Sequence, residues 1–230
     1  MSNFQWDFST IWNNIGYLGQ GLAGTLYLAA ICLVFGTLLG LLLGLALSSH
    51  RVLLRIPAQM FVGLFRNTPS MVQLLWIYYA LPVLLGVQLS PFIAAIVAFS
   101  LYSACDISGI FKSGIVSIPK GQIEAARALA LTRLQTLRLV ILPQAVRKMI
   151  PPFANQAMEI IKLTSIASII AYGELVLHTK TISDQEFRPI EAYTTLALLF
   201  STILIPLAYL TLHLEKKFSD YRMPSKSQKS

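Results

Sequence analysis

The chain has 230 residues, of which 55% are hydrophobic and only 12% are charged, whereas soluble domains carry about 25% charged residues. This composition excludes an ordinary soluble enzyme and indicates a protein surrounded largely by lipid. The net charge of +8 does not indicate a nucleic-acid-binding protein, because the basic residues lie between apolar runs and do not line one soluble face.

Long stretches without charge predict the membrane spans. No Asp, Glu, Lys or Arg occurs between Asp7 and Arg51, or between Arg66 and Asp106. Apolar runs of about 18 residues or more are typical of transmembrane helices, which satisfy their backbone polar groups internally. The sequence therefore predicts an all-α integral membrane protein, one domain over residues 1–220, with about five spans near 22–47, 67–84, 91–111, 150–172 and 192–213.

The placement of Lys and Arg predicts the orientation. With the N-terminus outside and the C-terminus inside, almost all basic residues lie in inner segments, and only Lys180 and Arg188 lie outside. The last residues, 221–230, are basic and polar and are predicted to form a disordered tail beside anionic lipid. The bilayer itself is therefore an expected partner of the chain.

The inner segment 112–149 is predicted to contain two short helices. Residues 122–130 are strong helix formers, and Pro119 is acceptable at the first turn of such a helix. Thr132 and Gln135 have capping-box spacing, which predicts a second helix that Pro143 ends or bends. These helices either lie on the membrane surface or dock a soluble partner, and the residues alone leave both interpretations open.

A family resemblance becomes specific in this segment. The run GQIEAARALALTRLQTLRLVILPQAVRKMIPP resembles the EAA loop of bacterial ABC importer permeases. The resemblance implies a coupling helix that docks into a groove of an ATPase subunit, with Glu124, Ala125 and Ala126 at its core and Gly121 and Ala130 beside them. It also implies that ATP and Mg²⁺ are held by the ATPase, and that this chain itself binds no cofactor.

Other motifs are similar to those of the polar amino-acid branch of that family. Arg66-Asn67-Thr68-Pro69 with Val72-Gln73 resembles its R-G-T-P-L-x-V-Q signature, with Asn in place of Gly. Further matches at residues 114–122, 142–145 and 162–165 follow in the same order, so the resemblance covers about residues 20–218. It implies the transmembrane subunit of an ATP-driven importer whose partners are an ATPase dimer, a second permease chain, identical or related, and an extracytoplasmic substrate-binding protein.

Further positions depart from the family pattern, among them Asp106 and Gly109, which stand where the family often has an aromatic residue and a Glu late in the third span. Two other departures are Ala130 and Leu163. Ala130 stands where the family usually has Gly, which would cost about 1 kcal/mol if the backbone there is left-handed. Leu163 stands where the family commonly has Asp after the Lys of the fourth span. The second change falls where substrate would pass, so the sequence does not identify which amino acid is carried.

Three ionisable residues lie well inside predicted spans: Asp106, Glu159 and Lys162. A charge at the centre of a bilayer costs about 2.5–3.5 kcal/mol, so each of these side chains is expected to have a partner or to face water. Glu159 and Lys162 are three residues apart on a helix and can neutralise each other. Alternatively, Lys162 would meet the carboxylate of an amino acid and Asp106 or Glu159 its ammonium group, with Thr164 and Ser165 also on the substrate pathway.

Three further residues have less specific predictions. Arg66 is either a membrane anchor whose charged head reaches the interface or part of a gate, and the anchor is favoured. Glu174 and His178, near the end of the fourth span, are predicted to be solvated.

Enzyme motifs are absent from the sequence. It has no Gly-Lys pair and therefore no P-loop, and it has no HExxH, CxxC or G-x-S-x-G motif. We therefore assign no catalytic residue and no metal site, and energy for transport must come from a partner or a gradient. The rival hypothesis is a gradient-driven carrier or channel, in which Asp106 and Glu159 would relay protons or bind a coupling ion.

Overall fold

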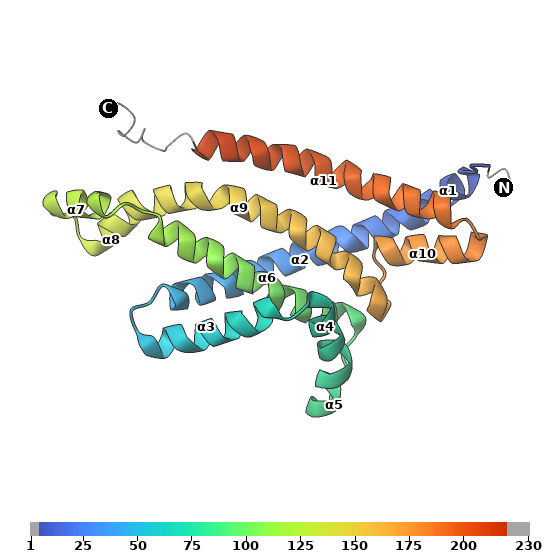
Figure 1. Cartoon of the computed structure of the whole chain (residues 1–230), viewed down its shortest axis with the longest axis horizontal. Coiled ribbons are helices and arrows are strands. Elements are labelled where there is room, and N and C mark those ends of the chain that lie inside the picture. The colour runs from blue at the N-terminus through green and yellow to red at the C-terminus, as the bar shows by residue number, and fades with distance from the viewer. Residues whose placement is uncertain (1–4, 220–230) are drawn as a thin grey trace, which may run out of the picture.

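The computed structural model describes residues 5–219, which form an elongated helical bundle (Figure 1). Short helices occupy its two ends. One end, called the α10 end, holds α1 (Ser9–Asn13) and α10 (Leu175–Glu186), and the other, the α7 end, holds α7 (Lys120–Ala128) and α8 (Arg133–Gln135). The long helices that run between the ends are α2 (Ile15–Leu47), α6 (Pro91–Val116), α9 (Leu142–Leu163) and α11 (Pro189–Ser219).

The spans agree with an all-helical membrane protein. Within residues 5–219, three helices are long and apolar enough to cross a membrane: α2, α6 and α11. Two further helix pairs pass the same test but are bent, by 103° between Val52–Asn67 and Ser70–Leu85 and by 49° between Arg133–Ile170 and Leu175–Glu186. Five spans are reached if each bent pair counts as one. The side of the membrane on which each terminus lies stays a prediction, and the predicted tail 221–230 lies outside the described residues.

Close packing of α2 against α6 forms the centre of the bundle. Gly36, Gly40 and Gly44 follow one another at four-residue spacing on the α2 face that meets α6. A Cβ atom on Gly40 would lie 2.7 Å from Cγ2 of Ile107, and one on Gly44 the same distance from Cβ of Phe111. In lipid, helices associate mainly through such van der Waals contact, so these small residues set the separation of the two helices.

The second span predicted at 67–84 corresponds to the helical stretch Ser70–Leu85, which passes the membrane test only together with the helix before it. Helix α3 (Val52–Asn67), which the sequence analysis missed, lies along α2 and α6, and the chain then turns sharply. Thr68 precedes Pro69 and is extended, with φ −97° and ψ 130°, because proline disfavours a helical conformation in the preceding residue. The following helical stretch, α4 (Ser70–Leu75), the π turn η1 (Trp76–Ala80) and α5 (Leu81–Leu85), stands across the long axis of the bundle (Figure 1).

Side chains satisfy the carbonyl groups that this break exposes. Asn67 donates its amide to the Gly63 carbonyl at 2.6 Å, and the Thr68 hydroxyl donates to the Leu64 carbonyl at 2.8 Å. The Gln73 amide donates to the carbonyls of Phe65 and Thr68, the latter at 3.0 Å. Water does not reach such groups inside a membrane, so a broken helix requires internal partners of this kind. This requirement explains the polar residues of the Arg66–Gln73 motif.

Two π turns end two residues before prolines. The turn η1 precedes Pro82, and η2 (Thr136–Ile141) precedes Pro143. Proline has no N–H group and its ring clashes with the carbonyl four residues earlier, and a wider turn relieves both problems. Of the two outcomes predicted at Pro143, the end of the helix does not occur, because the helical chain continues through η2 into α9. The proline instead coincides with an interruption of the regular α-helical pattern by the π turn.

A second break follows α9 and the 3₁₀ turn η3 (Thr164–Ile170). Ala171 has a left-handed backbone, with φ 57°, and the chain turns into α10. Glu174 begins that helix: its carboxylate accepts hydrogen bonds from the amides of Val176 at 2.8 Å and Leu177 at 2.9 Å. Its side chain is fully buried, so the prediction that Glu174 is solvated was wrong, and the reason is its N-cap role.

Candidate functional site

The predicted coupling helix exists as α7, at the tip of the α7 end (Figure 1). It begins directly after Pro119, close to the predicted boundary. The predicted second helix is confirmed at α8, where the Thr132 hydroxyl accepts from the Gln135 amide at 3.3 Å and the Gln135 side chain accepts from the Thr132 amide at 2.9 Å. This capping box fixes where the chain turns back toward the bundle.

A left-handed residue ends α7. Ala130 has φ 55°; its amide donates to the Arg127 carbonyl at 2.9 Å and that of Leu131 to the Ala126 carbonyl at 3.1 Å. This pair of bonds is the Schellman motif, which usually places Gly at the left-handed position. Ala130 therefore adopts a left-handed conformation in which its Cβ atom costs about 1 kcal/mol.

The predicted docking residues lie on different sides of α7. Gly121, Glu124 and Ala125 are exposed, whereas Ala126 is 2% exposed and packs inside the chain. Ala126 therefore holds α7 against its own chain, and the surface that α7 presents outward includes Glu124 and Ala125. The helix contacts η2, which leads into α9.

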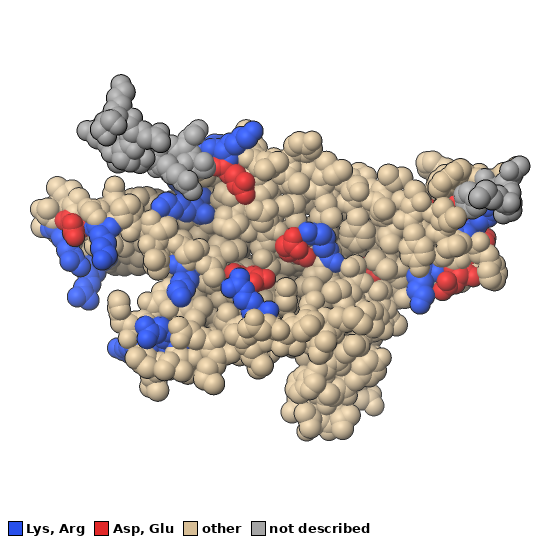
Figure 2. Space-filling model, viewed as in Figure 1, with Lys and Arg blue, Asp and Glu red and all other residues tan. Residues whose placement is uncertain are grey.

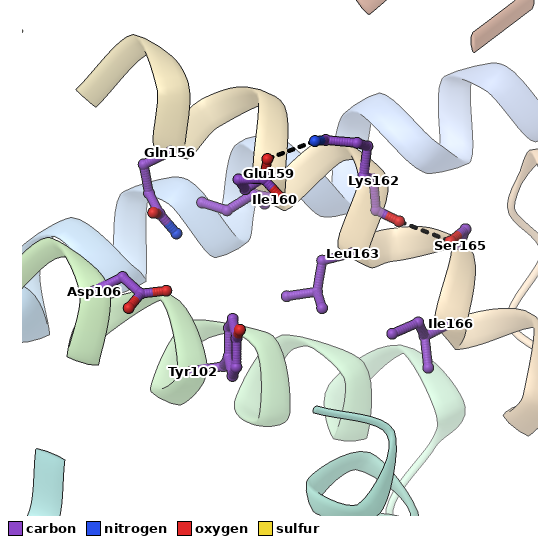
Figure 3. A pocket seen from close by; sticks show the side chains of 9 residues that line it. All are labelled: Tyr102, Asp106, Gln156, Glu159, Ile160, Lys162, Leu163, Ser165 and Ile166. Atoms are coloured by element: carbon purple, nitrogen blue, oxygen red, sulfur yellow. Dashed lines mark hydrogen bonds and ion pairs between the residues drawn. The ribbon is translucent and has the colours of Figure 1, made fainter. Parts of the chain in front are cut away.

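A pocket of about 380 Å³ lies between α6 and α9 in the middle of the bundle (Figure 3). Tyr102 and Asp106 extend from α6, and Gln156 extends from α9 toward them. The pocket lining also includes Glu159, Ile160, Lys162, Leu163, Ser165 and Ile166. The structure thus brings Asp106, Glu159, Lys162 and Ser165 together, as the pathway hypothesis requires.

Thr164 does not belong to this pocket. Its side chain is fully buried, and its hydroxyl donates to the Ile161 carbonyl at 2.8 Å. The pathway role suggested for Thr164 by its place in the motif is therefore not supported by its orientation. Ser165 does line the pocket, although its hydroxyl donates to the Lys162 carbonyl at 2.7 Å.

Sequence reasoning missed the two other polar residues of the lining, Tyr102 and Gln156. Tyr102 lies one turn before Asp106 on α6, and Gln156 lies three residues before Glu159 on α9. The helical spacing to the charged residues was the available signal, because positions three or four apart share a helix face.

The charged groups in the middle of the bundle form two pairs. Arg66, at the end of α3, reaches Asp106 on α6, with 3.2 Å between Nε and Oδ1. The Lys162 ammonium contacts the Glu159 carboxylate one turn earlier on α9 (Figure 3). The expectation that Asp106, Glu159 and Lys162 each have a partner is confirmed, and the partner of Asp106 is Arg66.

All four side chains are accessible, and Figure 2 shows acidic and basic side chains next to one another in the middle of one face of the bundle. The exposed fractions are 59% for Arg66, 26% for Asp106, 62% for Glu159 and 49% for Lys162. Around them the visible face is mostly uncharged between the two charged ends. Because a charge facing lipid at this depth is costly, the face that carries these pairs requires water or protein next to it.

The sequence model of the family described as "Binding-protein-dependent transport system inner membrane component" matches residues 36–220. The chain belongs to this family. It is therefore an inner membrane protein, and membership favours the importer hypothesis over the gradient-driven carrier. The family is that of the non-catalytic membrane subunit of ABC transporters, which work with an ATPase and a substrate-binding protein.

Amino-acid permeases of this family are similar over nearly the whole chain. The probable amino-acid ABC transporter permease protein YckA of Bacillus subtilis is 36% identical, covering 96% of this chain and 99% of its own length. The glutamine transport system permease protein GlnP of Escherichia coli is also 36% identical, covering 93% and 98%. A crystal structure of an amino acid ABC transporter with histidines shares the fold, with a TM-score of 0.86, 28% identity, and coverage of 93% of this chain and 100% of that one.

Proposed function

We propose that this permease forms half of the translocation pathway of an ATP-driven, binding-protein-dependent importer of polar amino acids, and that its ATPase docks on α7. The observation that best supports this proposal is the structure of α7. It is a short helix at the tip of the bundle that ends in a Schellman turn, and Glu124 and Ala125 are exposed on it. A helix fixed in this manner can receive force from a partner and pass it to the helices on either side of it.

The charge pairs support a second permease chain as the other half of the pathway. Arg66, Asp106, Glu159 and Lys162 open onto one face at a depth where lipid is an unfavourable neighbour. A second chain, identical or related, placed against this face would enclose a polar passage and remove these charges from lipid. One bundle of this size does not enclose such a passage alone.

The pocket between α6 and α9 has the chemistry that an amino acid needs. The Lys162 ammonium would meet the substrate carboxylate, and Asp106 or Glu159 would meet its ammonium group. Because the present ion pairs already neutralise these groups, a zwitterion would exchange one pair of charges for another without adding net charge. Glutamine is the first substrate to test, since one relative is named for glutamine transport.

In the proposed cycle, a binding protein delivers substrate at the α10 end, where Lys180, Asp184 and Glu186 are exposed. ATP and Mg²⁺ are held by the ATPase dimer at the α7 end. Closure of the two ATPase subunits on ATP moves α7 in each permease and switches the pathway from inward-open to outward-open. This chain contributes no catalytic residue, no metal ligand and no nucleic-acid-binding surface to the cycle.

The first experiment is purification of the tagged chain from its native membrane in mild detergent, with mass spectrometry of the proteins that copurify. We expect an ATPase with Walker motifs to copurify with the wild type and to be lost with Glu124→Lys. The matched control is Glu186→Lys, which changes an exposed carboxylate at the opposite end and should retain the ATPase. If an abundant, folded wild-type chain brings no ATPase, the docking proposal is wrong.

A second experiment tests the energy source. Membrane vesicles loaded with ATP should take up glutamine in the presence of the binding protein, and vesicles with a proton gradient but no ATP should not. Uptake that persists without ATP would instead support the gradient-driven carrier. A second permease sequence among the copurified proteins would indicate a heterodimer, and its absence a homodimer.

A further inference from the structure

The end of α6 and the beginning of α9 are joined directly beside α7. The Lys148 ammonium, near the start of α9, donates to the Ser117 carbonyl at the C-terminus of α6, at 2.8 Å. These residues are 31 positions apart, and the whole of α7 lies between them in the chain. A cation at a helix C-terminus also interacts favourably with the helix dipole, which adds to this bond.

An apolar contact closes the same junction. Met149, the neighbour of Lys148, is 8% exposed and packs against Gly114 of α6 so closely that a Cβ atom on Gly114 would lie 2.2 Å from the Met149 Cε. Ile118 and Ala145 are buried around Met149 in the same cluster. We call the four residues Gly114, Ser117, Lys148 and Met149 the α6–α9 joint.

The helices that meet at this joint also carry the two walls of the pocket. Tyr102 and Asp106 lie on α6, about two turns or more from the joint, and Gln156 and Glu159 lie on α9 at a similar remove. Because α7 is connected covalently to both helices and the joint fixes one helix to the other, a displacement of α7 reaches both walls at once.

We propose that the α6–α9 joint makes α6, α7 and α9 move as one rigid unit. In this proposal Lys148 is the positioning residue that holds α9 against α6 while the ATPase moves α7. The proposal rests on the proposed function, since it assumes that α7 is the site of docking. Without the joint, α7 would move while α9 relaxed independently, and ATP hydrolysis would be separated from transport. The pocket walls therefore keep their spacing while the whole unit shifts against the rest of the protein.

The test uses the complete transporter, purified with its ATPase and binding protein and reconstituted into liposomes. Uptake and ATP hydrolysis are measured together for Lys148→Met, Lys148→Arg and the control Lys112→Met, which changes an exposed lysine at the same end of α6. We expect Lys148→Met to retain assembly and ATP hydrolysis while uptake per ATP falls about fivefold, the effect of losing one hydrogen bond. Lys148→Arg should restore the ratio, and Lys112→Met should not alter it.

A covalent rescue separates this role from a general loss of stability. In the double variant Ser117→Cys/Lys148→Cys, uptake per ATP should be low, and a short bifunctional thiol reagent that joins the two cysteines should restore it. The native Cys32 and Cys105 are buried and will not compete for the reagent.

The outcomes are distinguishable. Restoration by the cross-link supports the joint, whereas unchanged coupling in Lys148→Met, or loss of uptake when the joint is cross-linked, overturns it. If either of the latter occurs while Glu124→Lys still abolishes uptake, the proposed function stands and only the joint is wrong. If wild-type uptake does not depend on ATP at all, the proposed function itself fails.

Discussion

The left-handed backbone of Ala130 lowers the stability of the protein by an amount that a substitution can measure. The residue adopts φ 55° in the Schellman turn that ends α7, where a Cβ atom is unfavourable. We expect Ala130→Gly to stabilise the protein by about 1 kcal/mol, measured by thermal unfolding in detergent. The control is Ala128→Gly, in the last turn of α7 with ordinary helical geometry, which should destabilise it by about 0.5–1 kcal/mol. Equal effects of the two substitutions would contradict the role given to the left-handed angle.

The Arg66–Asp106 pair gives a second prediction for single residues. Asp106→Asn leaves a guanidinium without its counter-charge inside the membrane, and Arg66→Met leaves a carboxylate in the same state. We expect each substitution to lower both stability and uptake, and the double substitution to recover part of the loss in stability. The coupling energy of such a contacting pair is about 0.5–3 kcal/mol, and a double-mutant cycle of unfolding midpoints measures it. Strictly additive effects would show that the pair contributes no mutual stabilisation.

For secondary-structure elements, the break between α3 and α4 depends on Gln73. Its amide satisfies two carbonyls at the bend, and an unsatisfied buried polar group costs about 1–3 kcal/mol. We therefore expect Gln73→Leu to lower the free energy of unfolding by at least this amount, as measured by denaturant unfolding in micelles. Gln88→Leu, at an exposed position beyond α5, should change it little. A stable Gln73→Leu protein would indicate that other groups satisfy the carbonyls of the bend.

The same element shows where sequence reasoning succeeds and where it fails. Length and charge-free runs identified α2, α6 and α11, because burial in lipid imposes those patterns directly. The capping box at Thr132 was found because its geometry depends on residues three apart. Helix α3 was missed, because Arg55, Pro57 and Arg66 interrupt its apolar face and Pro69 was taken as an ordinary residue of a span.

Part of the candidate site could not be predicted from the sequence either. Glu159 and Lys162 are local neighbours, so their pairing was foreseen. Arg66 and Asp106 are far apart in the chain, and nothing in the helical periodicity connects them before the bundle is assembled. The burial of Thr164 likewise depends on which face of η3 meets the rest of the bundle. Local patterns thus predicted the elements and the capping groups, whereas contacts between distant elements required the structure.

For the whole molecule, the orientation in the membrane remains to be measured. The predicted arrangement places the α7 end, with its many basic residues, inside the cell and the α10 end outside. With cysteines introduced as Ser49→Cys in the turn after α2 and Asp184→Cys on α10, a membrane-impermeant thiol reagent should label only position 184 in intact cells. Both positions should react after permeabilisation, and labelling of position 49 in intact cells would reverse the orientation. The native cysteines are buried and provide a low background.

The two ion pairs in the middle of the bundle also have an electrical consequence. Moving one elementary charge across a potential of 100 mV involves about 2.3 kcal/mol, so even one uncompensated charge on the moving helices would make transport sensitive to voltage. Arg66, Asp106, Glu159 and Lys162 carry two positive and two negative charges, and their sum is zero. When α3 moves together with α6 and α9, to which the Arg66–Asp106 pair links it, the shift does almost no work against the membrane potential. The rate of this step of the import cycle should therefore depend on ATP and not on the membrane voltage.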